Sequence, residues 1–141
     1  TAEKGQGAFL NNKRLRVASR TDIHEALVGY EIPHRGGKEL VQSRHEIGAL
    51  QGKVIGIRGL GSAALALAYV AAGRLDVAMV RHIKPWDIAA GILLIREAGG
   101  FIHGLQGDVS PMDSGHILAA NADLLPQMLD AIKDAHAASS A

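Results

Sequence analysis

Short apolar segments alternate with longer segments of helical spacing along most of this 141-residue chain. Strands are predicted at residues 26–32, 54–58, 76–80, 100–103 and 116–120. Helices are predicted at 38–49, 62–72 and 87–98, and after a cap at Asn121. Strands and helices that alternate in this way belong to the α/β class, in which helices cover a sheet. A chain of this length is expected to form one domain, over residues 1–141.

The first 18 residues predict a β-hairpin. Gly5 and Gly7 would form one turn, residues 8–10 a strand, Asn11–Asn12 a tight turn and residues 15–18 the next strand. Since a domain rarely begins with half a hairpin, we expect this chain to be the C-terminal part of something longer.

The composition restricts the class of partner. A formal net charge of +1 gives no electrostatic reason to bind nucleic acid or an anionic membrane. The longest apolar run, 63–72, is far shorter than the ~20 residues that span a bilayer. The chain has no cysteine, which excludes disulfides and suits a cytoplasmic protein. We therefore predict neither a nucleic-acid partner nor a membrane partner.

The only tryptophan, Trp86, precedes Asp87 and an unbroken apolar segment at 88–95. Apolar residues on every side of a helix predict a helix that is buried all round. The Asp87 carboxylate at its start either caps the helix or holds a metal ion, and one carboxylate can do both. Near the other end, Glu97 needs a polar partner because an unpaired buried carboxylate is costly.

The glycine-rich sequence GLGSAA at 59–64 has three interpretations. It fits the G-x-G-x-x-A pattern of a dinucleotide-binding loop, and Arg81 after the next strand would tolerate the extra phosphate of NADP. Its glycines also suit a tight turn with close helix–strand packing. Alternatively, Gly61, Ser62 and Ala63 hold a polar substrate at the helix start.

Two separated blocks, IRGLGSAALALAYVAAGRLDVA at 57–78 and KPWDIAAGILLIREAGG at 84–100, closely resemble signature blocks of the inositol monophosphatase family. The opening residues 3–18 and the ILAAN sequence at 117–121 are also similar to that family. The resemblance implies a Mg²⁺-dependent phosphomonoesterase, usually a homodimer. Its architecture is a layered α-β-α-β-α fold, with a mixed sheet and flanking helices, and this chain is expected to form the C-terminal half.

The resemblance also implies roles for individual residues. Asp87 corresponds to a magnesium ligand of the family, which suits the preference of Mg²⁺ for carboxylate oxygens. Gly61, Ser62 and Ala63 correspond to the element that holds the hydroxyls of the sugar or polyol phosphate.

A further group corresponds to structural or subunit-contact positions of the family. Arg58 and Asp76 match a pair near the subunit contact, and they lie on strands that we expect to be adjacent, close enough for a salt bridge. Trp86 belongs to the same structural or dimer group.

Two departures limit what the resemblance implies. The family takes its other metal ligands from an upstream glutamate and an Asp-Pro-x-Asp-Gly-Thr loop, and neither occurs in this sequence. We therefore expect an incomplete site and no activity from this chain alone.

The second departure concerns the substrate. Val80 stands where inositol-selective members have a glutamate, so other sugar or polyol phosphates remain open as substrates. His34 and Arg35 lie in a possible substrate-side loop, with solvated loop residues as the other interpretation.

Another class of function competes with the enzyme. A non-catalytic binding or assembly module would keep the fold and the dimer surface without the chemistry, and the absent metal ligands favour it. An NADP-binding domain is a remote third interpretation.

Overall fold

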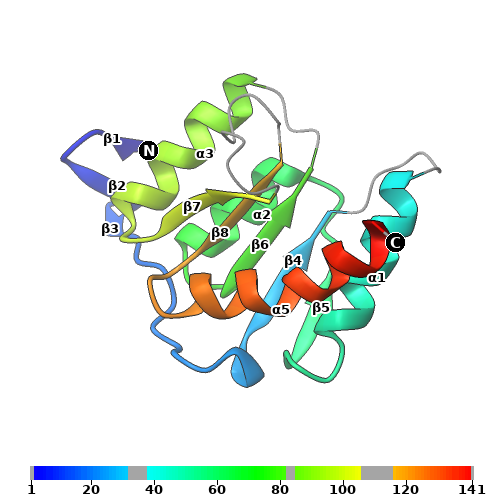
Figure 1. Ribbon diagram of the computed structural model, residues 1–141. Coiled ribbons are helices and arrows are strands. Elements are labelled where there is room, and N and C mark those ends of the chain that lie inside the picture. The colour runs from blue at the N-terminus through cyan, green and yellow to red at the C-terminus, as the bar shows by residue number, and fades with distance from the viewer. Residues whose placement is uncertain (1, 32–37, 82–84, 106–115, 141) are drawn as a thin grey trace.

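A computed structural model describes residues 2–31, 38–81, 85–105 and 116–140, and a five-stranded mixed sheet forms its centre (Figure 1). The strands lie in the order β5-β4-β6-β8-β7. β4 pairs in parallel with β5 and β6, whereas β8 is antiparallel to β6 and β7. Their bounds are β4 Leu27–Tyr30, β5 Gly56–Arg58, β6 Val77–Val80, β7 Phe101–Gly104 and β8 Ile117–Ala120.

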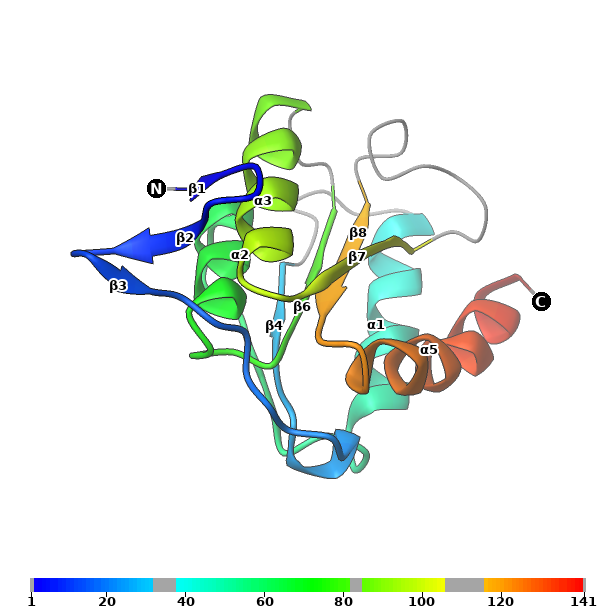
Figure 2. The ribbon, with the colours of Figure 1, turned by 90° about the vertical axis from the view of Figure 1, so that its left-hand side faces the viewer.

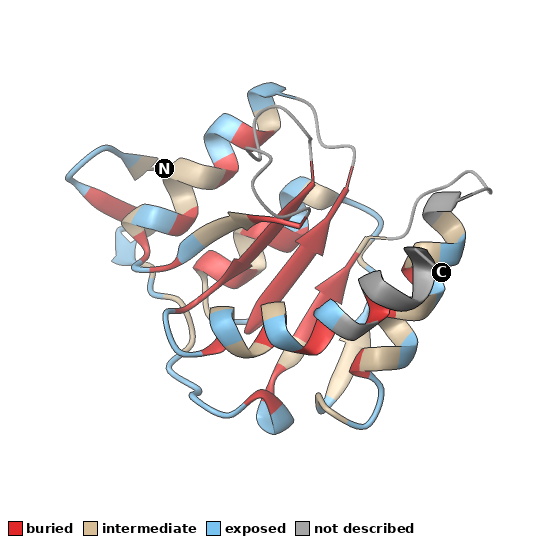
Figure 3. Cartoon of the chain, viewed as in Figure 1, coloured by how far each residue is buried: buried red, intermediate tan, exposed pale blue. Residues whose placement is uncertain are grey.

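Helices cover both faces of this sheet (Figure 2). Helices α2 (Ala63–Ala71) and α3 (Pro85–Glu97) lie on one face, and α1 (Lys38–Leu50) and α5 (Leu124–Ser140) lie on the other. Successive side chains of a strand point to opposite faces of the sheet, and both faces are covered by helices. The strand β6 is therefore apolar throughout and fully buried, as Figure 3 shows. The predicted α/β class, with a mixed sheet and flanking helices, is confirmed.

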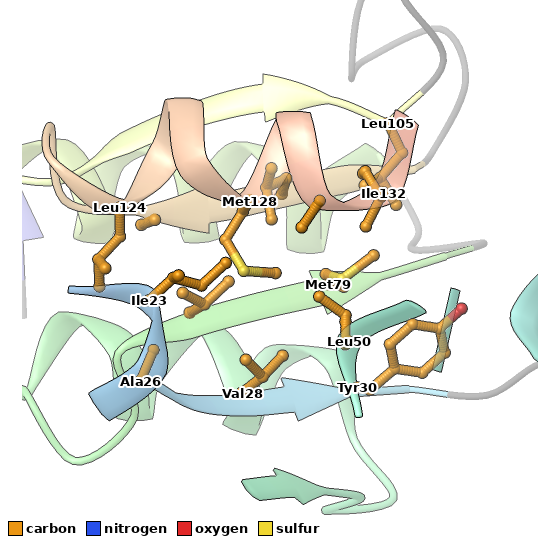
Figure 4. Packing of buried hydrophobic residues seen from close by; sticks show 14 residues of the cluster. Ile23, Ala26, Val28, Tyr30, Leu50, Met79, Leu105, Leu124, Met128 and Ile132 are labelled. Carbon is orange, nitrogen blue, oxygen red and sulfur yellow. The ribbon is translucent and has the colours of Figure 1, made fainter. Parts of the chain in front are cut away.

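The two helix layers enclose two hydrophobic clusters. The cluster on the α1/α5 side contains large side chains from three strands and both helices (Figure 4): Val28, Tyr30, Leu50, Met79, Leu118, Leu124, Met128 and Ile132. On the other side, small residues let α2 and α3 approach closely. A Cβ atom on Gly91 of α3 would overlap the Leu67 side chain of α2.

The N-terminal residues form a small antiparallel sheet that packs against α3 (Figure 1). Its strands are β1 Ala2–Glu3, β2 Gly7–Leu10 and β3 Lys13–Arg14. The predicted tight turn is confirmed, since Asn11 and Asn12 have φ of 50° and 64°. The predicted strand at 15–18 is wrong. The chain leaves the hairpin there, and the Val17 N–H donates to the Ala98 carbonyl beyond α3 instead.

The predicted strands and helices from residue 26 onwards are all present, and most of their ends differ by at most two residues from the predicted ones. The last helix continues to Ser140, four residues beyond its predicted end. Asn121 is a helix cap as predicted. Its side-chain oxygen accepts the Leu124 N–H at 2.8 Å. Among the helices that the structure describes, none combines the length and apolar character that a bilayer crossing needs.

Candidate functional site

The parallel strands β4, β5 and β6 end at the same edge of the sheet, which is the edge where α/β folds bind ligands. Three polar segments follow these strands directly. Glu31 follows β4, residues 59–62 follow β5, and Arg81 follows β6. Helices α2 and α3 begin beyond the same edge (Figure 2), so their first turns belong to this region.

The glycine-rich loop after β5 delivers the chain to the start of α2. Gly61 has a positive φ of 76°, which an L-residue rarely adopts, and Ser62 is the N-cap of α2. The Ser62 Oγ accepts the Leu65 N–H at 3.2 Å. Gly61 and Ser62 are exposed, and Ala63 is half-buried. The Ser62 oxygen thus acts as the acceptor in the cap, which leaves its O–H free to donate to a ligand.

Glu31 holds this loop from the neighbouring strand. Its Oε1 atom accepts the Leu60 N–H at 3.0 Å, and its own N–H donates to the Met79 carbonyl at 3.1 Å. No role for Glu31 was predicted from the sequence. The available signal was an acidic residue directly after a buried strand at the ligand-binding edge.

Asp87 lies in the first turn of α3 and is half-buried. The helix begins at Pro85, so Asp87 is not its N-cap, which was one of the two roles considered for this carboxylate. Proline is favoured at the first helical position because its missing N–H has no helical partner there. Within the described part of the chain, the Asp87 carboxylate forms no hydrogen bond or ion pair. It lies near the positive end of the helix dipole and is available to a cation.

The prediction that this helix is buried on all sides is also wrong. Ile88, Gly91 and Ile95 form its buried face. Trp86 is 69% exposed, and the two alanines at positions 89 and 90 are exposed. Alanine and single large apolar side chains occur at protein surfaces, so an apolar helix segment does not by itself identify a helix with no solvent-facing side.

Arg58 and Asp76 do not form the predicted salt bridge. The reason is the strand order, which places β4 between their two strands. The Asp76 carboxylate is 4% exposed; it accepts the Leu27 N–H at 2.7 Å and pairs with Arg20 at 3.3 Å. Arg58 is exposed and donates to the carbonyl of the preceding residue.

Arg81 is directed away from the loop at 59–62. It is 8% exposed, and its guanidinium forms an ion pair with Glu46 of α1. The Tyr30 hydroxyl donates to the same carboxylate. Burial, together with the nearby charge of Glu46, raises the pKa of Tyr30 to about 12. These three side chains join α1 to the sheet on the α1/α5 side.

The NADP-binding interpretation is therefore wrong on geometric grounds. In a dinucleotide-binding fold, the strand before the glycine loop is adjacent to the strand after the following helix. Here β5 and β6 are separated by β4. Arg81, which was predicted to tolerate the phosphate, is buried against Glu46 instead.

Comparison with known proteins decides the family. A sequence model described as "Inositol monophosphatase family" matches residues 1–137. The chain belongs to the inositol monophosphatase family. It is 46% identical over 137 residues to the inositol-1-monophosphatase of Rhizobium meliloti (strain 1021), covering 94% of this chain and 50% of that protein. It is also 39% identical over 134 residues to the Nus factor SuhB of Escherichia coli K12, covering 95% and 50% respectively.

Solved structures agree on the fold. The extragenic suppressor protein suhB of Bartonella henselae has a TM-score of 0.86 at 38% identity, covering 93% of this chain and 51% of that one. An IMPase of Thermotoga maritima has a TM-score of 0.84 at 30% identity, covering 98% and 52%. The chain thus spans about half the length of the inositol monophosphatase relatives that it matches.

The structure describes only some of the predicted site residues. His34 and Arg35 lie outside the described residues. Among the residues that the structure does describe, no group of three or more His, Cys, Asp or Glu side chains could hold a metal ion. Asp87 therefore belongs to no such group within the described residues.

Glu97, which needed a partner, has one in the N-terminal hairpin. Its Oε1 atom accepts the Gly7 N–H at 2.8 Å. Hydrogen bonds from the backbone of Gly7 and Gly5 hold the pKa of the Glu97 carboxyl below its usual range, and Arg14 adds to the effect. The helix that carries Asp87 at its first turn is thus tied to the hairpin at its last turn.

Proposed function

We propose that the protein is a Mg²⁺-dependent phosphomonoesterase that acts on a sugar or polyol phosphate, and that this chain carries part of its site. Membership of the inositol monophosphatase family supports the reaction class. The observation that carries the assignment within this chain is the Asp87 carboxylate, which is half-buried in the first turn of α3 and unpaired within the described residues.

The residues of this chain fit a magnesium ion in part. Mg²⁺ prefers hard oxygen ligands and keeps several waters, so one carboxylate from this chain suits it. When bound, the ion lowers the pKa of a water and neutralises charge on the phosphate. Asp87 would supply one oxygen from a rigid helix. The other ligands would come from a metal-binding part of the protein outside this sequence.

The loop before α2 would hold the alcohol part of the substrate. Gly61 and Ser62 are exposed, and the Ser62 O–H is free to donate while its oxygen caps the helix. Val80 is fully buried and its side chain has no acceptor, which argues against a requirement for inositol itself. The proposed substrates therefore include sugar and polyol phosphates in general. A homodimer with Arg58, Asp76 and Trp86 in structural or contact positions belongs to the same proposal.

Two measurements test this function. In the first, Mg²⁺-dependent phosphate release from inositol 1-phosphate and a small sugar-phosphate panel is measured on this chain together with the part of the protein that would supply the other metal ligands. The wild type, Asp87→Asn and the control Asp130→Asn are compared. Asp130 is exposed on α5, in the opposite helix layer. Loss of about 100-fold or more in Asp87→Asn alone would support the proposal. Release that Asp87→Asn retains would contradict the role of Asp87.

The second measurement does not require turnover. Mn²⁺, a paramagnetic substitute for Mg²⁺, is titrated into ¹⁵N-labelled protein. We expect selective broadening of the amide signals in the first turn of α3, and loss of that broadening in Asp87→Asn. A folded chain without either response would have no metal at Asp87, and the proposal would fail.

A non-catalytic assembly module is the second candidate. The observation that favours it is that relatives at 38–40% identity are named Nus factor SuhB or putative Nus factor SuhB. The same two measurements separate the candidates. A folded protein that shows neither phosphate release in the presence of the other metal ligands nor a metal response at Asp87 favours the module.

A further inference from the structure

Glu31 occupies a defined place beside the buried end of β6. Tyr30 is the register partner of Met79 in the parallel pairing of β4 with β6, so Glu31 is the next residue along, level with Val80. The Glu31 N–H continues the ladder by donating to the Met79 carbonyl at 3.1 Å. Neighbouring strands lie about 4.8 Å apart, so the two positions are direct neighbours.

The strand alternation shows which face this residue shares. Tyr30 points into the cluster on the α1/α5 side, and Val80 points into the cluster on the α2/α3 side. Glu31 follows Tyr30 and therefore faces the α2/α3 side. Its hydrogen bond to the Leu60 N–H agrees with this direction, because Leu60 lies in the loop that leads into α2.

The two carboxylate oxygens of Glu31 have different surroundings. Oε1 accepts the Leu60 N–H at 3.0 Å, whereas Oε2 has no hydrogen-bond partner within the described residues. The side chain is half-buried, so it is held in place and still reachable. An acceptor that is already immobilised loses little conformational entropy when a ligand binds.

We propose that Glu31 is a specificity-determining residue whose Oε2 atom accepts a hydrogen bond from a hydroxyl of a polyhydroxylated substrate alcohol. The inference rests on the proposed function and narrows its substrate class. The carboxylate lies beside the loop at 59–62 that would bind the alcohol part. The side chain of Val80, its neighbour on β6, offers no acceptor, so Glu31 supplies the side-chain acceptor at this level of the sheet.

Two substitutions separate a contact with substrate from support of the loop. Glu31→Gln keeps an oxygen for the Leu60 N–H but replaces the second acceptor with an NH₂ donor. Glu31→Ala removes both. Glu25→Gln is the matched control, because Glu25 is exposed in the short helix η1 (Ile23–Glu25), before the start of β4. The probes are inositol 1-phosphate, myo-inositol and methyl phosphate, the last of which carries no hydroxyl beyond its phosphate.

Binding is followed by the amide signals of Leu60 and Gly61, together with hydrogen exchange at Leu60. We expect both inositol compounds to shift these signals in the wild type and in Glu25→Gln. In Glu31→Gln, the dissociation constant for them should rise about tenfold or more, with exchange at Leu60 unchanged. The weaker response to methyl phosphate should be the same in all variants that keep the loop. Glu31→Ala should also speed exchange at Leu60.

The possible outcomes distinguish failure of the proposed role of Glu31 from failure of the proposed phosphatase function. No shift of the wild-type signals by either inositol compound would overturn the role of Glu31. Equal affinities in wild type and Glu31→Gln would also overturn it, even if Asp87-dependent phosphate release is present. Loss of inositol binding in Glu31→Gln without phosphate release would support Glu31 and count against the phosphatase.

Discussion

The Glu97 carboxylate at the end of α3 accepts the backbone N–H of Gly7 at 2.8 Å, across 90 residues of sequence. This contact joins the N-terminal hairpin to the helix that carries Asp87. Gly7 has a φ of 88°, and a Cβ at this position would lie 3.2 Å from the Arg14 Nε atom. The positive φ and this close contact favour glycine at the point where the hairpin turn approaches the carboxylate.

The first prediction concerns the pH dependence of this contact. The pKa of Glu97 is lower in the folded protein than in the unfolded chain, where it is about 4.3. Its contribution to stability is thus present above that value and is lost as the pH falls through the lower, folded value. We expect hydrogen exchange at Gly7, corrected for intrinsic rates, to accelerate below about pH 4. Glu97→Ala should show the fast exchange at every pH, and a wild-type-like pH profile in that variant would refute the prediction.

A second prediction concerns the buried group of Tyr30, Glu46 and Arg81. Tyr30 has a pKa raised to about 12, so the stability it contributes is fully present below its unfolded value of about 10 and declines as the pH rises through about 12. Ultraviolet difference titration should contain a phenolate component with a midpoint near 12 that Tyr30→Phe removes. An unchanged titration curve in that variant would show that Tyr30 does not ionise in this range.

The ion pair in the same group gives a third prediction. Arg81→Met leaves the Glu46 carboxylate buried without its cation, which should lower the free energy of unfolding by about 3–5 kcal/mol. The double variant Arg81→Met with Glu46→Gln should recover part of that loss. Denaturant unfolding measures both effects. A loss below about 1 kcal/mol in the single variant would mean that water or another group replaces the cation.

A fourth prediction compares the contributions to stability of Asp76 and Arg58, the two residues that were predicted to form a salt bridge between adjacent strands. Asp76→Ala removes the acceptor of the buried Leu27 N–H and should destabilise the fold by about 1–3 kcal/mol. Arg58→Ala should change stability by less than about 0.5 kcal/mol, because Arg58 is exposed and bonds only to an adjacent carbonyl in the described structure. Equal losses of unfolding free energy in the two variants would contradict this prediction, because they would indicate the salt bridge that the strand order excludes.

The fifth prediction tests the close packing of α2 against α3. Gly91→Ala adds a Cβ that overlaps Leu67, so we expect a loss of about 1–3 kcal/mol in unfolding free energy. Ala90→Ser, on the exposed side of the same helix, is the matched control and should have little effect. Combining Gly91→Ala with Leu67→Ala should cost less than the sum of the single losses. Strict additivity would indicate that the two side chains do not compete for space.

Local patterns in the sequence were sufficient to predict four features: the α/β class, the order of strands and helices after residue 26, the Asn11–Asn12 turn and the Asn121 cap. Each depends on residues within a few positions of one another: apolar spacing, residues that adopt positive φ, and side chains that cap a nearby N–H. The signature block around Trp86 and Asp87 likewise indicated the family that the comparison established.

Only the tertiary structure decided which segments became neighbours. The insertion of β4 between β5 and β6 separated Arg58 from Asp76, placed Glu31 beside Val80 and excluded the dinucleotide loop. The same folding brought Gly7 to Glu97 and Arg81 to Glu46. Strand order and side-chain partners depend on packing between residues far apart in sequence, and local propensity and periodicity do not encode which distant face a segment will meet.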